Sequence, residues 1–279
     1  MKFRKNLPPR PFAVSAVFVF AAVRATLGAD SGSTRMEEWK LAAEYKFNEA
    51  REAFSNLSEL NPKDREAALG EAASLINAQP KTRRNLTAAV HTLMALEDQN
   101  SRDDIGIAAT YLLGRIAAIH QQPADLETAR RHFTALAELR SPHPLAQLAI
   151  LNLVMLDLYA PDATDPAATR VATAESRAAY LLTPSARAQF HLVVGRACLA
   201  FDQPKSDALA HLKMALHHGI RSDRGRADTA ISAALLSIDC GAKDDAIRFL
   251  RLFLKENPRD VRAWTARKEL ERISGEQPK

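Results

Sequence analysis

Cysteine, glycine and aromatic residues are scarce in this chain of 279 residues, which has 2 Cys, 10 Gly and 6% aromatic residues. Two thiols are too few for a disulfide-built scaffold or a four-thiolate zinc site. With only ten glycines, the chain has little capacity for a glycine-rich loop that would bind a phosphate group. The rest of the composition, 47% apolar and 25% charged, is typical of a soluble globular protein and excludes collagen, intrinsic disorder and a multi-span membrane protein.

Recognisable catalytic motifs are also missing. The chain contains no G-x-S-x-G, H-E-x-x-H, G-x-x-x-x-G-K-[ST], G-x-G-x-x-G or C-x-x-C. We therefore expect no enzymatic activity, no cofactor and no metal. The alternative is an envelope hydrolase whose catalytic groups come from distant parts of the chain, because such sites are recognised by geometry.

Residues 1–29 have the layout of a secretory signal peptide. A basic head is followed by an apolar run at 12–23 and by small residues that end at Ala29. The run is shorter than the ~20 residues that a membrane span needs. We expect a periplasmic or secreted protein. An uncleaved anchor is the alternative, because Arg24 ends the apolar run, and it is the only membrane association we expect.

The formal net charge of +5 belongs entirely to this segment, which holds five basic residues and no acidic one. The rest of the chain contains 33 basic and 33 acidic residues. Its arginines are interleaved with aspartates in the C-terminal third. This balance predicts a solvated charged surface and no nucleic-acid partner.

From residue 36 onward, apolar residues recur at helical spacing, and hardly any stretch alternates as a strand would. In 243–256, for example, Ala246, Phe249, Leu250 and Phe253 form one apolar stripe. The pattern predicts an all-α chain of about 12 helices, at 36–59, 64–78, 82–98, 103–121, 125–140, 143–159, 167–182, 185–201, 205–218, 224–240, 243–256 and 259–273.

Prolines mark several of the breaks, because proline disfavours helix in the preceding residue. Ser141 and Thr183 precede prolines and are expected to cap the helices that follow. The stretch 160–166 is the longest interior break. We expect a linker, two helical parts joined by that loop and a tail, at 30–35, 36–159, 160–166, 167–274 and 275–279.

A repeat emerges when helix pairs are compared. Leu113-Gly114 and Val194-Gly195 lie in first helices, and Ala-x3-Phe or Ala-x3-Leu recurs in second helices. The Ala-x3-large pairs are Ala129/Phe133, Ala208/Leu212 and Ala246/Leu250. This pattern of residues resembles the tetratricopeptide repeat, which has a period of ~34 residues, and the related Sel1-type repeat. The alternative is an irregular helical bundle.

The resemblance implies an α-α superhelical solenoid of antiparallel helix pairs that binds a ligand on a concave face lined by first helices. Transferring the inward positions of that family predicts a binding face made of Tyr111, Arg115, Gln189, Arg196, Asp228 and Asp239. Arg115 and Arg196 follow the small residue in each unit. Two guanidinium groups on one surface would suit a peptide carboxylate or another acidic ligand.

Histidine and cysteine offer weaker candidates. His211 and His218 lie seven residues apart on one predicted helix face, with His217 beside them, but acidic residues are sparse nearby. We interpret them as solvated or core-edge histidines. Cys198 and Cys240 are offset by about one helical turn in the repeat alignment, which predicts two buried free thiols.

The resulting functional hypothesis is a non-enzymatic, exported adaptor that binds a protein or peptide in a cell-envelope or secretion assembly. A purely structural spacer is a further alternative. The terminal helix, 259–273, is expected to be a polar cap with Trp264 and Leu270 facing inward.

Overall fold

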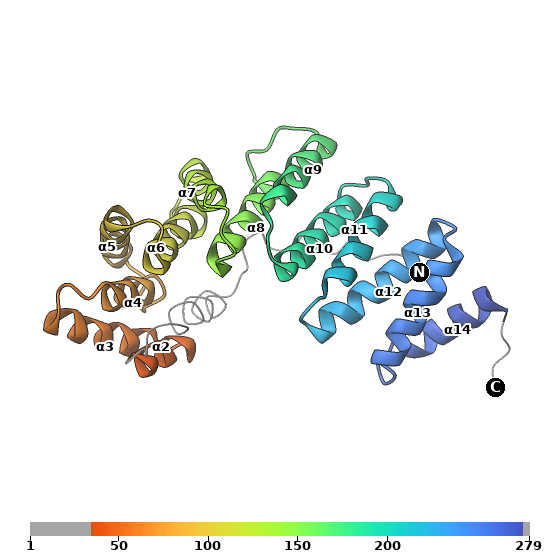
Figure 1. The fold of residues 1–279 in the computed structure, drawn as a ribbon, viewed down its shortest axis with the longest axis horizontal. Coiled ribbons are helices and arrows are strands. Elements are labelled where there is room, and N and C mark those ends of the chain that lie inside the picture. Colours follow the sequence, from red (N-terminus) through yellow and green to blue (C-terminus); the bar gives the residue numbers. More distant parts are fainter. Residues whose placement is uncertain (1–34, 276–279) are drawn as a thin grey trace. The chain divides into compact units, whose positions relative to one another are not determined.

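The computed structural model describes residues 35–275, which form two compact units, 35–160 and 161–275. The predicted signal peptide, nearly all of the predicted linker and residues 276–279 lie outside this range. The described residues are helical without any strand and contain 13 α-helices, in agreement with the predicted all-α class (Figure 1). None of these helices is long and apolar enough to cross a membrane.

The N-terminal unit consists of α2 (Met36–Ala43), α3 (Phe47–Leu60), α4 (Arg65–Leu75), α5 (Arg83–Gln99), α6 (Asp104–Arg115), α7 (Leu126–Glu138) and α8 (Pro144–Tyr159). A π-helical turn, Ile116–His120, extends α6. The C-terminal unit consists of α9 (Ala167–Ser176), α10 (Pro184–Ala200), α11 (Lys205–His218), α12 (Asp223–Asp239), α13 (Lys243–Glu256) and α14 (Ala263–Ser274). A 3-10 turn, Arg177–Tyr180, follows α9.

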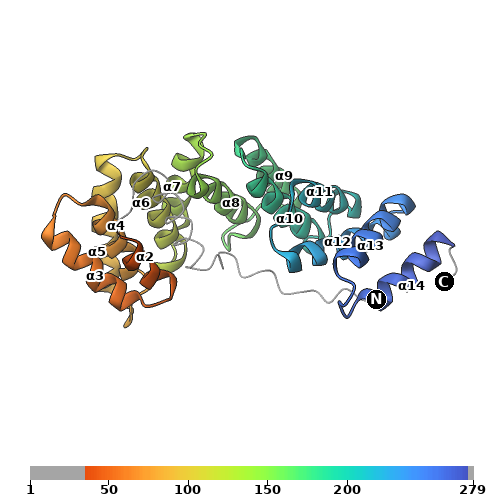
Figure 2. The ribbon, with the colours of Figure 1, turned by 60° about the horizontal axis from the view of Figure 1, so that its bottom comes forward.

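Consecutive helices pack against each other within each unit, as in an α-α solenoid (Figure 2). In the N-terminal unit, α2, α4, α6 and α8 also contact one another in that order. These alternate helices therefore form one layer, and α3, α5 and α7 form the other. The predicted pairs α6/α7, α10/α11 and α12/α13 are all in contact.

The Ala-x3-large signature lies at the centre of this packing. All three pairs noted in the sequence are buried, and two further pairs occur at Ala50/Phe54 and Ala89/Leu93. The five pairs belong to α3, α5, α7, α11 and α13, so the signature recurs in every other helix. The exception is α9, the first helix of the C-terminal unit.

Glycine permits the closest helix approaches. A methyl group at Gly114 in α6 would lie 2.6 Å from Phe133 Cε1 in α7, and one at Gly70 in α4 would lie 2.4 Å from Phe54 in α3. A methyl group at Gly195 in α10 would lie 3.0 Å from His211 Cβ in α11. The small residues therefore set the distance between helices, and the large residues fill the space between them.

Charged pairs connect residues that are about one repeat apart. Arg262 binds Asp228 at 2.7 Å, Lys205 binds Asp239 at 2.6 Å and Lys213 binds Asp245 at 2.6 Å. The partners are separated by 34, 34 and 32 residues. Partly exposed pairs of this kind add little stability, but their spacing agrees with the repeat seen in the sequence.

The predicted helix 36–59 is wrong, because the chain breaks between α2 and α3. Tyr45 has φ 64°, and the amide of Lys46 donates to Leu41 O at 2.9 Å while that of Tyr45 donates to Ala42 O at 3.2 Å. This is a Schellman motif, which normally uses glycine. A tyrosine at the left-handed position left no recognisable stop signal in the sequence.

Thr183 caps α10 as predicted, accepting from Ala186 N at 3.3 Å, with Pro184 in the first turn. The prediction that Ser141 caps the next helix is wrong. His143 caps α8 through Nδ1, which accepts from Leu145 N at 3.2 Å. The sequence Ser-Pro-His-Pro offers two prolines, and the second one begins the helix.

The terminal helix also differs from the expectation. Trp264 is 62% exposed, Leu270 is partly exposed, and the buried positions of α14 are Ala263 and Ala266. Small residues allow α14 to approach α13 closely, so the indole lies outside the contact. The ammonium group of Lys268 lies 4.0 Å from the centre of the Trp264 ring.

We predict that Gly114→Ala lowers the free energy of unfolding of the N-terminal unit by about 1–3 kcal/mol, because the new methyl group meets the fully buried Phe133 ring. Chemical denaturation of the full chain measures this. Gly225→Ala is the control, because its added methyl has only ordinary contacts of 3.4 Å or more. Equal stability of Gly114→Ala and wild type would contradict the assigned packing.

Candidate binding surfaces

The structure corrects one predicted member of the binding face. Tyr111 is fully buried in α6, and its hydroxyl accepts a hydrogen bond from Asn152 Nδ2 at 3.2 Å. Every residue from Gly106 to Gly114 is buried, because α6 contacts α4, α5, α7 and α8. Tyr111 is therefore a core residue and is not available to a ligand. Arg115, at the end of α6, is partly exposed.

The other four predicted residues lie in the C-terminal unit. Gln189 is partly exposed and Arg196 exposed, seven residues apart on α10. Asp228 and Asp239 are engaged in the ion pairs with Arg262 and Lys205 described above. Arg115 and Arg196 belong to different units, so the predicted pair of guanidinium groups stays a prediction.

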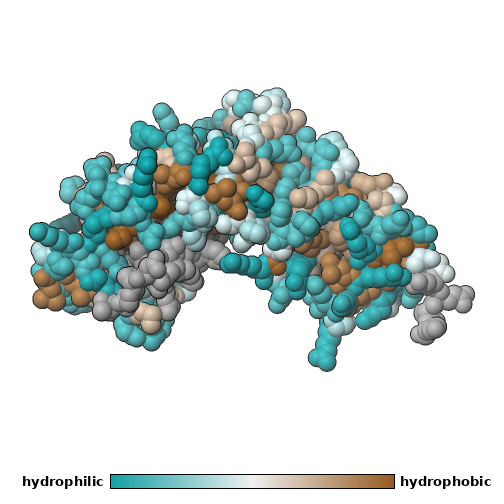
Figure 3. All heavy atoms as spheres, in the orientation of Figure 1, coloured by the Kyte–Doolittle hydropathy of each residue, from teal (hydrophilic) through white to brown (hydrophobic). Residues whose placement is uncertain are grey.

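The first helices of the C-terminal unit keep apolar side chains partly exposed beside these positions. On α12, they are Ile231, Leu235 and Ile238, and on α10 they are Leu192, Val193 and Leu199. On α12, the three residues follow the i, i+4, i+7 spacing of a single stripe. On α10, Leu192 and Leu199 lie seven residues apart on one face, and Val193 lies about 100° around the helix from Leu192. In the space-filling view, apolar patches lie among hydrophilic residues on this unit (Figure 3). We call the two sets together the α10/α12 stripe.

A histidine cluster joins three helices of the same unit. Nδ1 of His191 in α10 lies 3.0 Å from Nδ1 of His211 in α11. Nε2 of His211 lies 3.0 Å from Oε1 of Glu175 in α9. The His218 ring stacks on the His191 ring, with centres 5.6 Å apart and planes at 10°. His211 and His218 thus share one helix face, as the sequence predicted.

Two rings of the cluster, those of His191 and His218, have pKa values below the ordinary value. A carboxylate only accepts, so His211 Nε2 donates to Glu175. His211 Nδ1 can then accept a hydrogen bond from the Nδ1–H of His191. Burial, followed by the neighbouring His211 and His218 and then Arg187, lowers the pKa of His191 to about 4. Burial, with His217 and Arg187, also lowers the pKa of His218.

Within residues 35–275, no group of three or more His, Cys, Asp or Glu side chains is arranged to hold a metal ion. The histidine cluster has two imidazole nitrogens close together, with Glu175 on the far nitrogen of His211. The two hydrogen bonds connect α9 to the α10/α11 pair. Protonation of His191 changes the hydrogen bond between His191 and His211.

Both cysteines are free, as predicted. Cys198 is buried, and its burial, together with Glu175 and Asp207, raises the pKa of the thiol to about 11. A thiol held protonated in this way is a weak nucleophile. The prediction that Cys240 is buried is wrong, because this residue follows the last turn of α12, just before Gly241, and is exposed.

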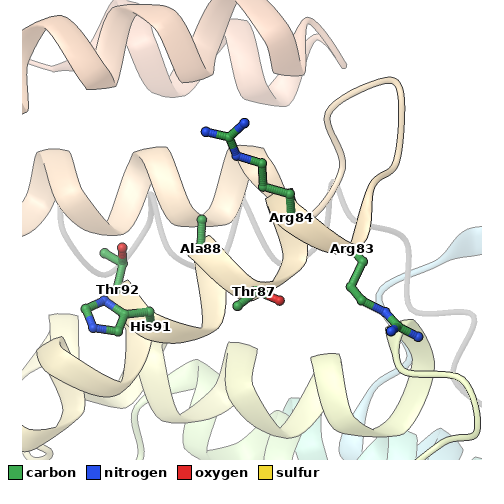
Figure 4. Close-up of a pocket in the computed structure, with 6 residues that line it drawn as sticks. All are labelled: Arg83, Arg84, Thr87, Ala88, His91 and Thr92. Atoms are coloured by element: carbon green, nitrogen blue, oxygen red, sulfur yellow. The ribbon is translucent and has the colours of Figure 1, made fainter.

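A further surface lies on α5, which sequence inspection did not single out. A shallow hollow on the helix is lined by Arg83, Arg84, Thr87, Ala88, His91 and Thr92 (Figure 4). All six lining residues within the described part of the chain come from α5, so the hollow follows one face of this helix. We call these six residues the α5 face. The two arginine side chains point to opposite sides of the helix (Figure 4).

No protein-family model and no curated protein matches the chain. Function has to be inferred from the side chains that the helices bring together. His191 was missed because it is 20 residues from His211. The signal that could have found it is Gly195, one turn further along α10, which already indicated a close approach to α11. For α5, the overlooked signal is two arginines in the first turn.

We predict that acidification destabilises the C-terminal unit through His191. Its pKa is about 4 in the folded chain and ordinarily 6.5, so the unfolded chain binds the proton more readily between these values. Stability is therefore complete above about pH 6.5 and falls toward pH 4. Solvent screening at this partly exposed site limits the loss to about 1 kcal/mol.

Hydrogen exchange of the full chain at pH 7.5 and pH 4.5, resolved by unit, tests this. His191→Gln should flatten the pH dependence in the C-terminal unit only. His120→Gln is the matched control, because burial, with Lys81 and Arg115, lowers the pKa of His120 to about 4 in the N-terminal unit. An unchanged pH dependence of the C-terminal unit in His191→Gln would refute the assignment.

Proposed function

We propose that this chain is an exported, non-enzymatic adaptor of the tetratricopeptide-like type, which binds a protein or peptide of a cell-envelope assembly. The recurrence of Ala-x3-large in alternate helices, and of ion pairs at 32–34 residues, supports the comparison with that repeat. The signal-like layout of residues 1–29 supports export.

The observation that carries the proposal is the α10/α12 stripe. First helices line the ligand surface in the resembling family, and here they keep six large apolar side chains partly exposed. Partly exposed apolar side chains with polar groups such as Gln189 and Arg196 among them are typical of sites that bind a helix or an extended peptide.

The polar groups at the border have a separate part in the proposal. Arg196 is exposed and follows Gly195, whose missing side chain lets α11 approach α10. Its guanidinium group offers a forked donor to a carboxylate of the bound peptide. Asp228 and Asp239 are engaged in ion pairs with Arg262 and Lys205.

We predict that Arg196→Glu combined with Leu235→Asp reduces recovery of the partner at least fivefold in a crosslinking pull-down from the envelope fraction of the native host. The first change reverses the charge at the edge of the stripe and the second places a carboxylate in its middle. Mass spectrometry identifies and quantifies the recovered partner.

The matched control is Arg259→Glu combined with Met214→Asp, which makes the same two kinds of change at other exposed positions of this unit. Circular dichroism checks that both double variants stay helical. Equal recovery with the two double variants would argue against the α10/α12 stripe as the binding surface.

A further inference from the structure

The charges along α5 oppose the helix dipole. Its first turn contains Arg83 and Arg84 and no acidic residue, and its last turn contains Glu97 and Asp98 and no basic residue. Cations at a helix N-terminus are unfavourable, because they face the positive end of the helix dipole. Among the helices of the described range, α5 is the one whose first turn has two cations and no acid. The folding of α5 alone does not account for this placement.

The cations at this end of α5 are not neutralised within the described part of the chain. No hydrogen bond or ion pair there engages the side chains of Lys81, Arg83 or Arg84. By contrast, Arg65 and Arg130 of the same unit bind Asp103 and Asp157. Residues 35–160 contain 14 Lys and Arg against 17 Asp and Glu. The unpaired cations are therefore not explained by a shortage of acidic residues in this unit.

The positive region extends beyond α5 itself. Lys81, in the loop before α5, and Arg115, at the end of α6, both lower the pKa of His120 in addition to the effect of its burial, and no acidic residue opposes them. His120 ends the π-helical turn after α6. Two segments of the N-terminal unit, the loop before α5 and the end of α6, therefore bring positive charge close to His120.

The shape of the α5 face indicates what kind of anion fits. Arg83 and Arg84 point to opposite sides of the helix, so they do not converge on one small anion (Figure 4). Thr87 and Ala88, with short side chains, lie between the arginines and His91. This arrangement leaves room for a chain along the helix with acidic groups at separate points.

We propose that the α5 face docks an extended acidic segment of a partner protein. Arg83, Arg84 and Lys81 bind carboxylates of that segment, and the short side chains of Thr87 and Ala88 accommodate its backbone. The inference rests on the proposed adaptor function and adds the chemistry of a partner for the N-terminal unit. The unpaired charge of the α5 face carries it, independently of the α10/α12 stripe.

The test measures binding of the full chain to a fluorescein-labelled peptide of alternating Glu and Ala, by fluorescence anisotropy. We expect Arg83→Glu/Arg84→Glu to weaken binding at least tenfold. We expect Arg51→Glu/Arg102→Glu, two exposed arginines of the same unit, to change it less than twofold. Binding should also weaken between 50 and 300 mM salt, because exposed charges are screened.

A lowered unfolding temperature would distinguish loss of binding through misfolding from loss of the docking charges. Glutamates in the first turn of α5 complement the helix dipole, so Arg83→Glu/Arg84→Glu should unfold at the same temperature as wild type or higher. Equal loss of binding in both arginine pairs, or no binding by wild type, would overturn the proposal. So would stronger attachment to vesicles containing phosphatidylglycerol than to the peptide, which would indicate a membrane surface instead.

The same measurement separates this inference from the proposed function. Arg196→Glu/Leu235→Asp should bind the acidic peptide as wild type does, because both changes lie in the other unit. Peptide binding that depends on Arg83 and Arg84 supports the α5 face even when the envelope pull-down recovers no partner, a result that counts against the adaptor function. Partner recovery without peptide binding refutes the α5 face alone.

Discussion

The close approach of neighbouring helices is the constraint on which the rest of this structure depends. In alternate helices, namely α3, α5, α7, α11 and α13, a buried alanine allows close contact, and a phenylalanine or leucine one turn later fills the space between helices. Gly114 and Gly70 bring their helices so close to Phe133 and Phe54 that even a methyl group would not fit. Such contacts leave little freedom in the angle and distance between helices, and the repeat follows from them.

That packing also determines which faces remain for a partner. In the N-terminal unit, α6 touches four helices and has no exposed face between Gly106 and Gly114, whereas α5 in the other layer keeps an open one. In the C-terminal unit, α10 and α12 keep apolar stripes partly exposed. The two faces differ in character, since one is basic and the other apolar, which suits an adaptor with two kinds of contact.

Polar groups between helices make the stability of this scaffold depend on pH. The chain from Glu175 through His211 to His191 joins α9, α10 and α11, and burial together with the proximity of His211 lowers the pKa of His191. Asp228 and Asp239, which the resemblance to the repeat family assigns to a ligand surface, form ion pairs with Arg262 and Lys205. Ion pairs between repeats use residue types that also serve in binding, so residue type alone does not separate the two roles.

Helix content, most helix boundaries and the repeat could be predicted from the order of residues, because apolar spacing, prolines and small residues are local signals. The helices at 205–218 and 243–256 begin and end where the pattern places them. The burial of Tyr111, the exposure of Trp264 and the meeting of His191 with His211 depend on which helix faces pack together. Those contacts join residues far apart in the chain, so the spacing of residues along one helix contains no record of them.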